Sequence, residues 1–246
     1  MPAALPGDFY QFEELLSESE LQVLMRVREF LHAKVIPVAN DCWAKAEFPT
    51  HLIPGYADLG IPGLSGGAEP PASSLLTGFI AMEMAHADPS MATFFGVHAG
   101  LAMGSIAACG SPEQRQRWLP AMGRMEQIGA FALTEPSGGS DVSTGMLTTA
   151  SRDGDVWVLN GAKRWIGNGT FADLVVVWAK DVADGHVKGF VVRKGTPGFT
   201  ATRIENKIAL RTVQNADIVL DGCRGDEADR MANATSFRDT AGILRR

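Results

Sequence analysis

The sequence predicts an α+β protein in which an N-terminal helical bundle domain is followed by an antiparallel β domain. Two observations support this fold class. In the first half of the chain apolar residues recur at helical intervals, whereas from about Ile128 they alternate with a period of two. The period changes around 124–130, so we expect the helical domain at 1–127 and the β domain at 128–222. Charged residues crowd the start of the remaining segment, 223–246, which we interpret as a solvated linker.

Capping signals divide the helical domain into its elements. Ser17 and Ser111 each stand three residues before a Glu or Gln, which is the spacing of a capping box at a helix start. Pro37 is expected to bend or end the first helix, and a later helix closes near Asp88. Residues 91–109 carry hardly a charge, which favours a helix buried inside the bundle.

The β domain is marked by stretches rich in Val, Ile, Thr, Trp and Phe. Turn sequences such as Asp153-Gly154 separate them, and Asn160-Gly161 is a signal for a tight hairpin. We expect seven or eight short strands, the last of which ends near Asp221. The clearest stretches cover 145–151, 155–165, 172–180 and 187–194.

The composition excludes several classes of partner. The chain of 246 residues has a formal net charge of −6 and a pI near 5.4, which argues against nucleic acid and anionic membrane surfaces. With 46% apolar residues it can form packed cores. It has no run of about eighteen consecutive apolar residues, so we expect no membrane-spanning segment.

The cysteines, the histidines and the N-terminus bear on location and on metals. The N-terminus lacks the pattern of a signal or transit peptide, and the cysteines are too few and too scattered for a disulfide framework or a zinc site. A reducing compartment, the cytoplasm, is the expected location. His86 and His98 have no cysteine or carboxylate at ligand spacing, so we expect ordinary core or surface histidines and no metal. The cysteines are Cys42, Cys109 and Cys223.

Residues 131–168 hold the residue types best suited to binding a ligand. Glycines in the Pro-Ser-Gly-Gly-Ser-Asp loop after Glu135 allow backbone N–H groups to approach a ligand closely. Trp165 offers a large apolar face on which a planar ring can lie. Residue types alone favour the simpler interpretation, in which the loop is a turn and the tryptophan belongs to the core.

Two long motifs in this region resemble those of a known family. The first is Phe-x-Leu-Thr-Glu-Pro-x-x-Gly-Ser-Asp at 131–141, and the second is Asn-Gly-x-Lys-x-Trp-Ile-x-Asn at 160–168. Both resemble the flavin-contacting segments of the flavin-dependent acyl-CoA dehydrogenases, in the same order and with similar spacing. The resemblance runs from about Phe12 to the C-terminus and is closest to glutaryl-CoA dehydrogenases and plant short-chain acyl-CoA oxidases. It implies a helical N-terminal domain and a β-barrel-like middle domain.

The resemblance also implies FAD as cofactor and an acyl-CoA as substrate. Thr134 would hydrogen-bond near the flavin N5, and Ser140 would contact both flavin and acyl-CoA. Many relatives have threonine where this chain has Gly167, which removes a hydroxyl contact, although the plant oxidases are similar here. The cofactor-binding residues implied in this way are Phe131, Leu133, Thr134, Gly139, Ser140, Trp165, Ile166 and Gly167.

The chain departs from the family pattern at its C-terminus. Family members carry a third, helical domain that supplies the catalytic glutamate, and this chain stops at Arg246, where that domain should begin. On this view 223–246 is a linker followed by the first turns of the bundle, with nothing to pack against. No acidic residue here matches the family's base, so no catalytic residue is assigned and impaired activity is expected.

The implied reaction is α,β-dehydrogenation of a short-chain acyl-CoA. The glutaryl-specific branch carries an arginine at the position matching Ala92, and 89–103 contains no arginine, which favours an uncharged acyl chain. Three alternatives remain open: an acyl-CoA oxidase that passes electrons to oxygen, one half of a split enzyme, and a non-catalytic binding module. A homotetramer is expected for the family.

Overall fold

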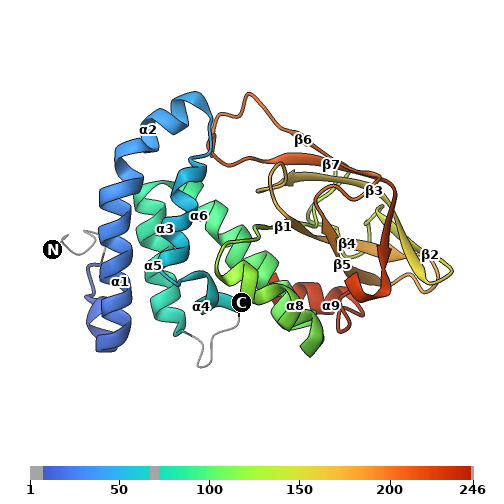
Figure 1. Ribbon diagram of the computed structural model, residues 1–246, viewed down its shortest axis with the longest axis horizontal. Coiled ribbons are helices and arrows are strands. Elements are labelled where there is room, and N and C mark those ends of the chain that lie inside the picture. The colour runs from blue at the N-terminus through green and yellow to red at the C-terminus, as the bar shows by residue number, and fades with distance from the viewer. Residues whose placement is uncertain (1–7, 67–71, 245–246) are drawn as a thin grey trace.

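The computed structural model describes residues 8–66 and 72–244, and it places a helical domain beside a curled sheet (Figure 1). The expected fold class is confirmed. The helical half consists of a 3₁₀ turn at Phe12–Leu15, α1 (Glu18–Phe30), a π-helical stretch at Leu31–Val35, α2 (Ile36–Lys45), a 3₁₀ turn at Thr50–Leu52, α3 (Ile53–Asp58), α4 (Pro62–Gly66), α5 (Ser74–Ala87), α6 (Pro89–Phe95), a π-helical stretch at Gly96–Met103, α7 (Gly104–Cys109) and α8 (Pro112–Gly123).

The predicted capping signals form as expected. Ser17 accepts a hydrogen bond from the N–H of Glu20, whose carboxylate accepts one from the N–H of Ser17. Ser111 and Gln114 form the same reciprocal pair at the start of α8. Pro37 lies in the first turn of α2, directly after the π-helical stretch, so the helical path changes there without a loop.

The helical path Pro89–Cys109 runs through the helical domain. Within the described residues it is the one helix, 21 residues long, that is long and apolar enough to cross a membrane. The sequence was expected to contain no membrane-spanning segment, because this stretch is not an unbroken run of apolar residues. Of its most apolar window, 56% is buried inside the protein, so its burial favours a core helix. The prediction of a buried helix at 91–109 is therefore confirmed.

Seven strands form one sheet in the described part of the chain. Their order is β1-β4-β2-β3-β7-β6, and β5 pairs with the other side of β4. Most pairs are antiparallel as predicted, but β1 and β2 both run parallel to β4. Both strands pair with the same side of β4, one after the other. The alternation of apolar residues indicates a strand but not whether it runs parallel or antiparallel to its neighbour. The strands are β1 (Gly129–Ala132), β2 (Thr149–Asp153), β3 (Val156–Ile166), β4 (Leu174–Asp181), β5 (Val187–Arg193), β6 (Phe199–Arg203) and β7 (Ala216–Asp226).

The hairpin predicted at Asn160-Gly161 is wrong. Both residues lie within β3, where the register against β7 shifts between Leu159 and Gly161. Gly161 has φ 145°, and a Cβ there would lie 2.7 Å from Cα of Thr148. Leu159 and Gly161 are two positions apart, whereas their partners Cys223 and Leu220 are three apart, so the extra residue of the β-bulge lies in β7, where Gly222 has φ +59°. Gly161 instead allows the close backbone contact with Thr148.

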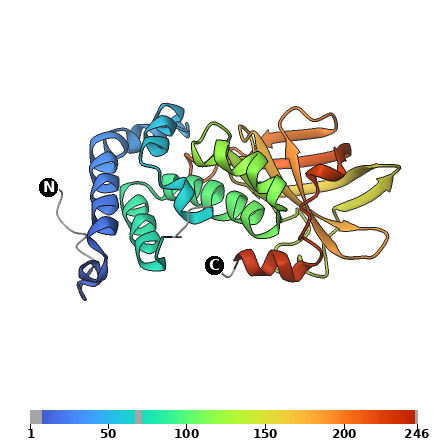
Figure 2. The ribbon, with the colours of Figure 1, turned by 60° about the horizontal axis from the view of Figure 1, so that its bottom comes forward.

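The segment after Asp221 also differs from the prediction of a solvated linker and an unpacked stub. Strand β7 continues to Asp226, and α9 (Phe237–Leu244) lies beside α7 (Figure 2). Thr240 and Ile243 on α9 are buried. The charged side chains that suggested a linker lie at the end of β7 and in the 3₁₀ turn Glu227–Asp229 that follows, and most form ion pairs, as between Arg224 and Asp153.

Two apolar cores organise the molecule. One fills the helical domain and extends onto a face of the sheet, where it includes Phe131 and Trp178. The other lies inside the curl of the sheet around Trp157, Ile166 and Phe190. Because β1 contributes alternate side chains to both cores, the end of β1 is fixed at the boundary between helices and sheet.

Candidate functional site

The two predicted motifs meet where β1 and β3 end. The N–H of Arg164 donates a 2.8 Å hydrogen bond to the carbonyl of Thr134. From the adjacent residue, Nζ of Lys163 donates to the carbonyl of Leu133 at 3.1 Å. Segments that are thirty residues apart in the chain are thereby held side by side around Thr134.

Glu135 is the structural centre of the first motif. Its Oε1 accepts hydrogen bonds from the Thr148 N–H at 2.9 Å and from Nζ of Lys163 at 2.9 Å, and its Oε2 accepts one from the Leu147 N–H at 2.7 Å. Burial acts to raise the pKa of Glu135, but these hydrogen bonds outweigh it and hold the pKa below its usual range. Glu135 is thus an ionised connecting group, not a proton acceptor for a substrate.

Lys163 is fully buried beside Glu135. Burial lowers the pKa of Lys163 to about 8, although the hydrogen bond and the charge of Glu135 act in the opposite direction. The sequence interpretation did not assign a role to this lysine. The alternation of the strand could have indicated its burial. Lys163 is an even number of positions from Trp157 and Leu159, so it is expected on the same buried face of β3, where a charged side chain requires a partner.

The glycine-rich loop folds around Asp141. The N–H of Glu135 donates to the Gly138 carbonyl at 3.0 Å, and the Gly138 N–H donates back to the Glu135 carbonyl at 3.3 Å. A Cβ at Gly138 or at Gly145 would overlap the Asp141 carboxylate. The Asp141 carboxylate thus lies against Gly138 and Gly145, and the Asp141 carbonyl closes the loop by accepting the N–H groups of Thr144 and Gly145 at 3.0 and 2.8 Å.

Two of the predicted residues lie on the outer side of this loop. Gly139 faces Thr134, since a Cβ at Gly139 would lie 3.4 Å from the Thr134 methyl group. Ser140 is exposed at the loop tip. The structure thus brings Gly139 and Thr134 together and leaves the Ser140 hydroxyl accessible to a ligand.

Trp165 stands at the end of β3 with its ring uncovered. Its side chain is 53% exposed, its φ is +62°, and the guanidinium of Arg164 lies 5.3 Å from the ring centroid. The carbonyl of Trp165 accepts a hydrogen bond from Nδ2 of Asn215. A non-glycine residue in the left-handed region persists only where its surroundings fix it, and such positions are frequent at binding sites.

The residues that follow Trp165 connect the sheet to the helical domain. Gly167 is buried, and a Cβ there would lie 3.0 Å from Cγ2 of Val97. Nδ2 of Asn168 donates to the carbonyls of Phe94 and Gly129, each at 3.1 Å. The absence of a threonine at 167 therefore has a steric reason, because Val97 occupies the space that its Cβ would need.

Three predicted residues present no free side chain. Phe131 and Leu133 belong to the core shared with the helices, and Ile166 belongs to the core inside the sheet. A ligand at this site would reach them through their backbone, whereas Thr134, Ser140 and Trp165 offer side-chain surface.

His98 is the satisfied core residue that the sequence predicts. Its Nδ1 accepts from the Gly129 N–H at 2.9 Å, which leaves Nε2 to donate to the Met122 carbonyl at 3.0 Å. Burial lowers the pKa of His98 to about 4. The ring is therefore neutral and joins the central helical path to the start of β1.

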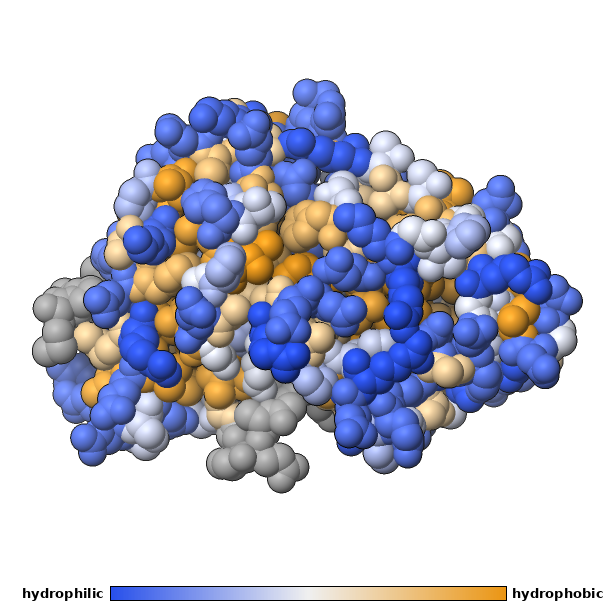
Figure 3. Space-filling model, viewed as in Figure 1, coloured by the Kyte–Doolittle hydropathy of each residue, from blue (hydrophilic) through white to orange (hydrophobic). Residues whose placement is uncertain are grey.

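An apolar pocket of about 130 Å³ opens on the surface of the helical domain. Ala92, Gly96 and Gly100 form one wall, and a Cβ at either glycine would meet no atom within 4 Å. Of the described residues that line it, Thr77 alone has a polar side chain. Hydrophobic atoms are also exposed near the middle of the face where helices and sheet meet (Figure 3).

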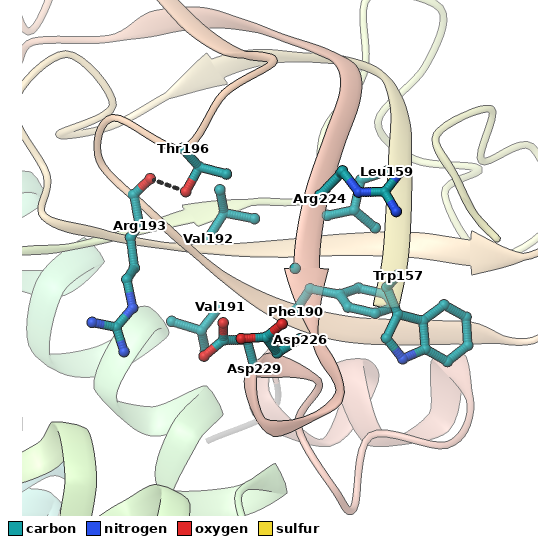
Figure 4. A pocket seen from close by; sticks show the side chains of 11 residues that line it. Trp157, Leu159, Phe190, Val191, Val192, Arg193, Thr196, Arg224, Asp226 and Asp229 are labelled. Atoms are coloured by element: carbon teal, nitrogen blue, oxygen red, sulfur yellow. Dashed lines mark hydrogen bonds between the residues drawn. The ribbon is translucent and has the colours of Figure 1, made fainter. Parts of the chain in front are cut away.

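A second cavity, of about 40 Å³, lies between β5 and β7 (Figure 4). The carboxylates of Asp226 and Asp229 lie close together there, and the guanidinium of Arg193 points away. It has room for a water molecule but not for a flavin ring. No predicted cofactor residue lines it.

Family models match both halves of the chain. Residues 17–126 match the acyl-CoA dehydrogenase N-terminal domain, and residues 130–223 match the acyl-CoA dehydrogenase middle domain. The chain belongs to the acyl-CoA dehydrogenase family. The family resemblance drawn from the two motifs is thereby confirmed.

Individual relatives agree with the family models. The mitochondrial short-chain specific acyl-CoA dehydrogenase of Mus musculus is 33% identical over 221 residues, which are 87% of this chain and 53% of the relative. A glutaryl-CoA dehydrogenase from Mycobacterium smegmatis, solved in complex with FADH2, superposes with a TM-score of 0.90 and 34% identity over 96% of this chain and 61% of that chain. Butyryl-CoA dehydrogenase from Megasphaera elsdenii gives a TM-score of 0.86 at 27% identity, covering 93% and 62%. The chain spans about half the length of the curated relatives that it matches.

Proposed function

We propose that this chain binds FAD at the junction of β1 and β3. The proposal rests on the contact between the two motifs. Lys163 and Arg164 donate hydrogen bonds to the Leu133 and Thr134 carbonyls beside the exposed ring of Trp165. Bound FAD would supply a hydride acceptor. The contacts proposed for it are Phe131, Leu133, Thr134, Gly139, Ser140, Trp165, Ile166 and Gly167.

The residues present suit a planar, partly polar ring system. Trp165 provides an apolar surface that is 53% exposed, while the Thr134 hydroxyl and the loop backbone offer hydrogen bonds at its edge. Fixing these groups before the ligand arrives reduces the cost of ordering them on binding. Ser140, exposed at the loop tip, is placed to contact an acyl-CoA as well.

The reaction supported best is α,β-dehydrogenation of a short, uncharged acyl-CoA thioester. Among the described residues the pocket beside Ala92 has apolar walls and no charged lining side chain, so a carboxylate on the acyl chain would be poorly compensated there. Its volume corresponds to about four water-sized groups, which suits a short chain.

This chain's own residues account for binding and orientation more clearly than for proton removal. Glu135 is engaged by three hydrogen bonds, and Asp141 is an exposed residue of the glycine-rich loop that matches no catalytic base in the family motif. A missing general base reduces a rate by about 10²–10⁴-fold. We therefore propose weak or absent turnover by this chain alone, with an oxidase, a split enzyme or a binding module as the alternatives.

Visible spectroscopy of the purified chain tests the proposal. We expect added FAD to bind and its absorption band to change shape, and a short acyl-CoA to perturb the bound band more than glutaryl-CoA does. Trp165→Ala should weaken FAD binding, whereas Val182→Ala, at another exposed apolar side chain, should not. A chain that is folded by circular dichroism and takes up no FAD would overturn the proposal. Light scattering of the same sample tests the homo-oligomer expected for the family.

A further inference from the structure

A polar cleft of about 300 Å³ lies where the end of α2 meets the loop between β6 and β7. Four cationic side chains line it, Lys45, Arg203, Lys207 and Arg211, against the single carboxylate of Glu205. Mostly hydrophilic atoms cover this upper edge of the molecule (Figure 3). In a chain of net charge −6, such a local excess of positive charge is a distinct feature.

The four cations are not neutralised by the protein. Within the described part of the chain, no ion pair joins any of them to a carboxylate. Burial lowers the pKa of Lys207, and the nearby charge of Arg203 lowers it further. These cations therefore repel one another in the absence of an anion.

Part of this charge has a structural role at the end of α2. Arg211 donates from Nε to the Trp43 carbonyl and from Nη2 to the Ala44 carbonyl, each at 3.1 Å, and Arg203 donates to the Ala46 carbonyl. A helix C-terminus carries only about half a negative charge. Four full positive charges exceed what it requires, and in the described residues the ammonium of Lys45 has no hydrogen-bond acceptor.

The backbone around the cleft is held in an unfavourable conformation. Ala46, Asn206 and Leu210 have φ values of +55°, +57° and +46°. Ala46 and Asn206 line the cleft, and the Leu210 carbonyl accepts from Nζ of Lys207. Non-glycine residues of this kind persist where the surroundings fix them, often at ligand sites.

We propose that this cleft binds a diphosphate group. Diphosphate carries several negative charges on acceptor oxygens, and guanidinium groups bind such oxygens in pairs. The Arg203 guanidinium and the Lys45 ammonium supply the donors that α2 does not use. The cleft is also larger than a single water or halide site.

The cleft is connected to the end of β3. Asn215 accepts from Nζ of Lys207 at 2.6 Å and donates to the Trp165 carbonyl at 3.1 Å. One side chain thus joins the two sites. The diphosphate could come from the free anion or from a nucleotide, and the site requires neither flavin binding nor dehydrogenation.

Calorimetric titration of the FAD-free chain with inorganic diphosphate, and separately with ADP, tests the proposal. We expect saturable binding of both if the diphosphate alone is recognised, and tighter ADP binding if a nucleotide is the source. Lys45→Glu and Arg203→Gln should each weaken binding about tenfold or more, as expected for loss of a charge-assisted contact. Lys45→Glu leaves every hydrogen bond at the end of α2 intact, so it can be interpreted even if Arg203→Gln unfolds.

Arg224→Gln is the matched control, because Arg224 is exposed on β7 and is already paired with Asp153. It should leave diphosphate binding unchanged. Absence of saturable binding for both ligands, or an equal loss with Arg224→Gln, would overturn the proposal. Repeating the titration with FAD present separates the sources: competition identifies the dinucleotide's own diphosphate as the occupant, and simultaneous binding identifies a separate ligand.

Discussion

The ammonium of Lys163 lies 2.9 Å from Oε1 of Glu135, and both side chains are buried beneath the loop that follows β1. This pair joins the end of β1, the start of β2 and the end of β3, because Glu135 also accepts the N–H groups of Leu147 and Thr148. The same lysine fixes the Leu133 carbonyl. The geometry around Thr134 therefore depends on a buried charge pair rather than on the loop alone.

Replacing Lys163 by methionine should be strongly destabilising. The substitution leaves Glu135 buried without its cation, and breaking a buried pair in this way typically costs about 3–5 kcal/mol. Urea denaturation followed by circular dichroism measures the change in the free energy of unfolding. Lys163→Arg retains the charge and should recover part of the loss.

Arg124→Met is the control for that experiment. Arg124 pairs with Glu126, and both side chains are exposed. Exposed pairs contribute little, so no measurable change in the midpoint is expected. If both variants shift the urea midpoint equally, the buried pair has no special structural role.

Acid should destabilise the protein through His98. The folded-state pKa of about 4 lies below the ordinary value of 6.5, so between these pH values the unfolded chain binds a proton that the folded chain does not. Stability should therefore rise with pH across this window, and the contribution of His98 is lost as pH falls from 6.5 towards 4. A shift of this size corresponds to about 3 kcal/mol.

Thermal denaturation of two variants isolates this effect. Gln at 98 can accept and donate without gaining a charge, so His98→Gln should flatten the pH dependence of Tm in that window. His86 is exposed, and His86→Gln should leave the profile unchanged. An unchanged slope in His98→Gln would assign the acid sensitivity to other groups.

Gly167→Thr should destabilise the protein although the family motif favours threonine at this position. The new Cβ would lie 3.0 Å from Cγ2 of Val97, and overpacking of this kind typically costs about 1–3 kcal/mol. Val97→Ala should restore most of the stability in the double variant. A double-mutant cycle measured by urea denaturation quantifies the coupling, and additive effects would show that the two residues do not compete for space.

The sequence was sufficient for the fold class and for the motif pair, because hydrophobic period and capping residues act locally. Ser17 and Ser111 cap helices as predicted. It was insufficient at Asn160-Gly161, because glycine serves both in turns and where two backbones approach closely inside a sheet, and only the pairing of β3 distinguishes the two cases. The segment around α9 was misjudged for a similar reason, since its short amphipathic pattern does not reveal that α7 offers a surface.

The candidate site shows the same division between local and long-range information. The motif residues could be identified by resemblance, whereas the reason for Gly167 could not, because Val97 lies in a different domain and seventy positions away in the chain. The sequence identified Lys163 only as one position of the second motif and indicated no contact for it. Its burial and its contact with Glu135 depend on how β1, β2 and β3 come together.

Ala92→Arg should change which acyl-CoA the chain prefers. Ala92 lines the apolar pocket of the helical domain, where none of the described lining residues is charged. An arginine there would compensate a distal carboxylate, so glutaryl-CoA should bind more tightly and a short uncharged acyl-CoA more weakly, each by about tenfold for a single charge-assisted contact. Perturbation of the bound FAD spectrum by each thioester gives the two dissociation constants.

Ala92→Met adds comparable bulk without charge, and it should weaken the binding of both ligands. If Ala92→Arg and Ala92→Met behave alike, the cavity selects by size alone, and the proposed preference for an uncharged chain loses its electrostatic basis.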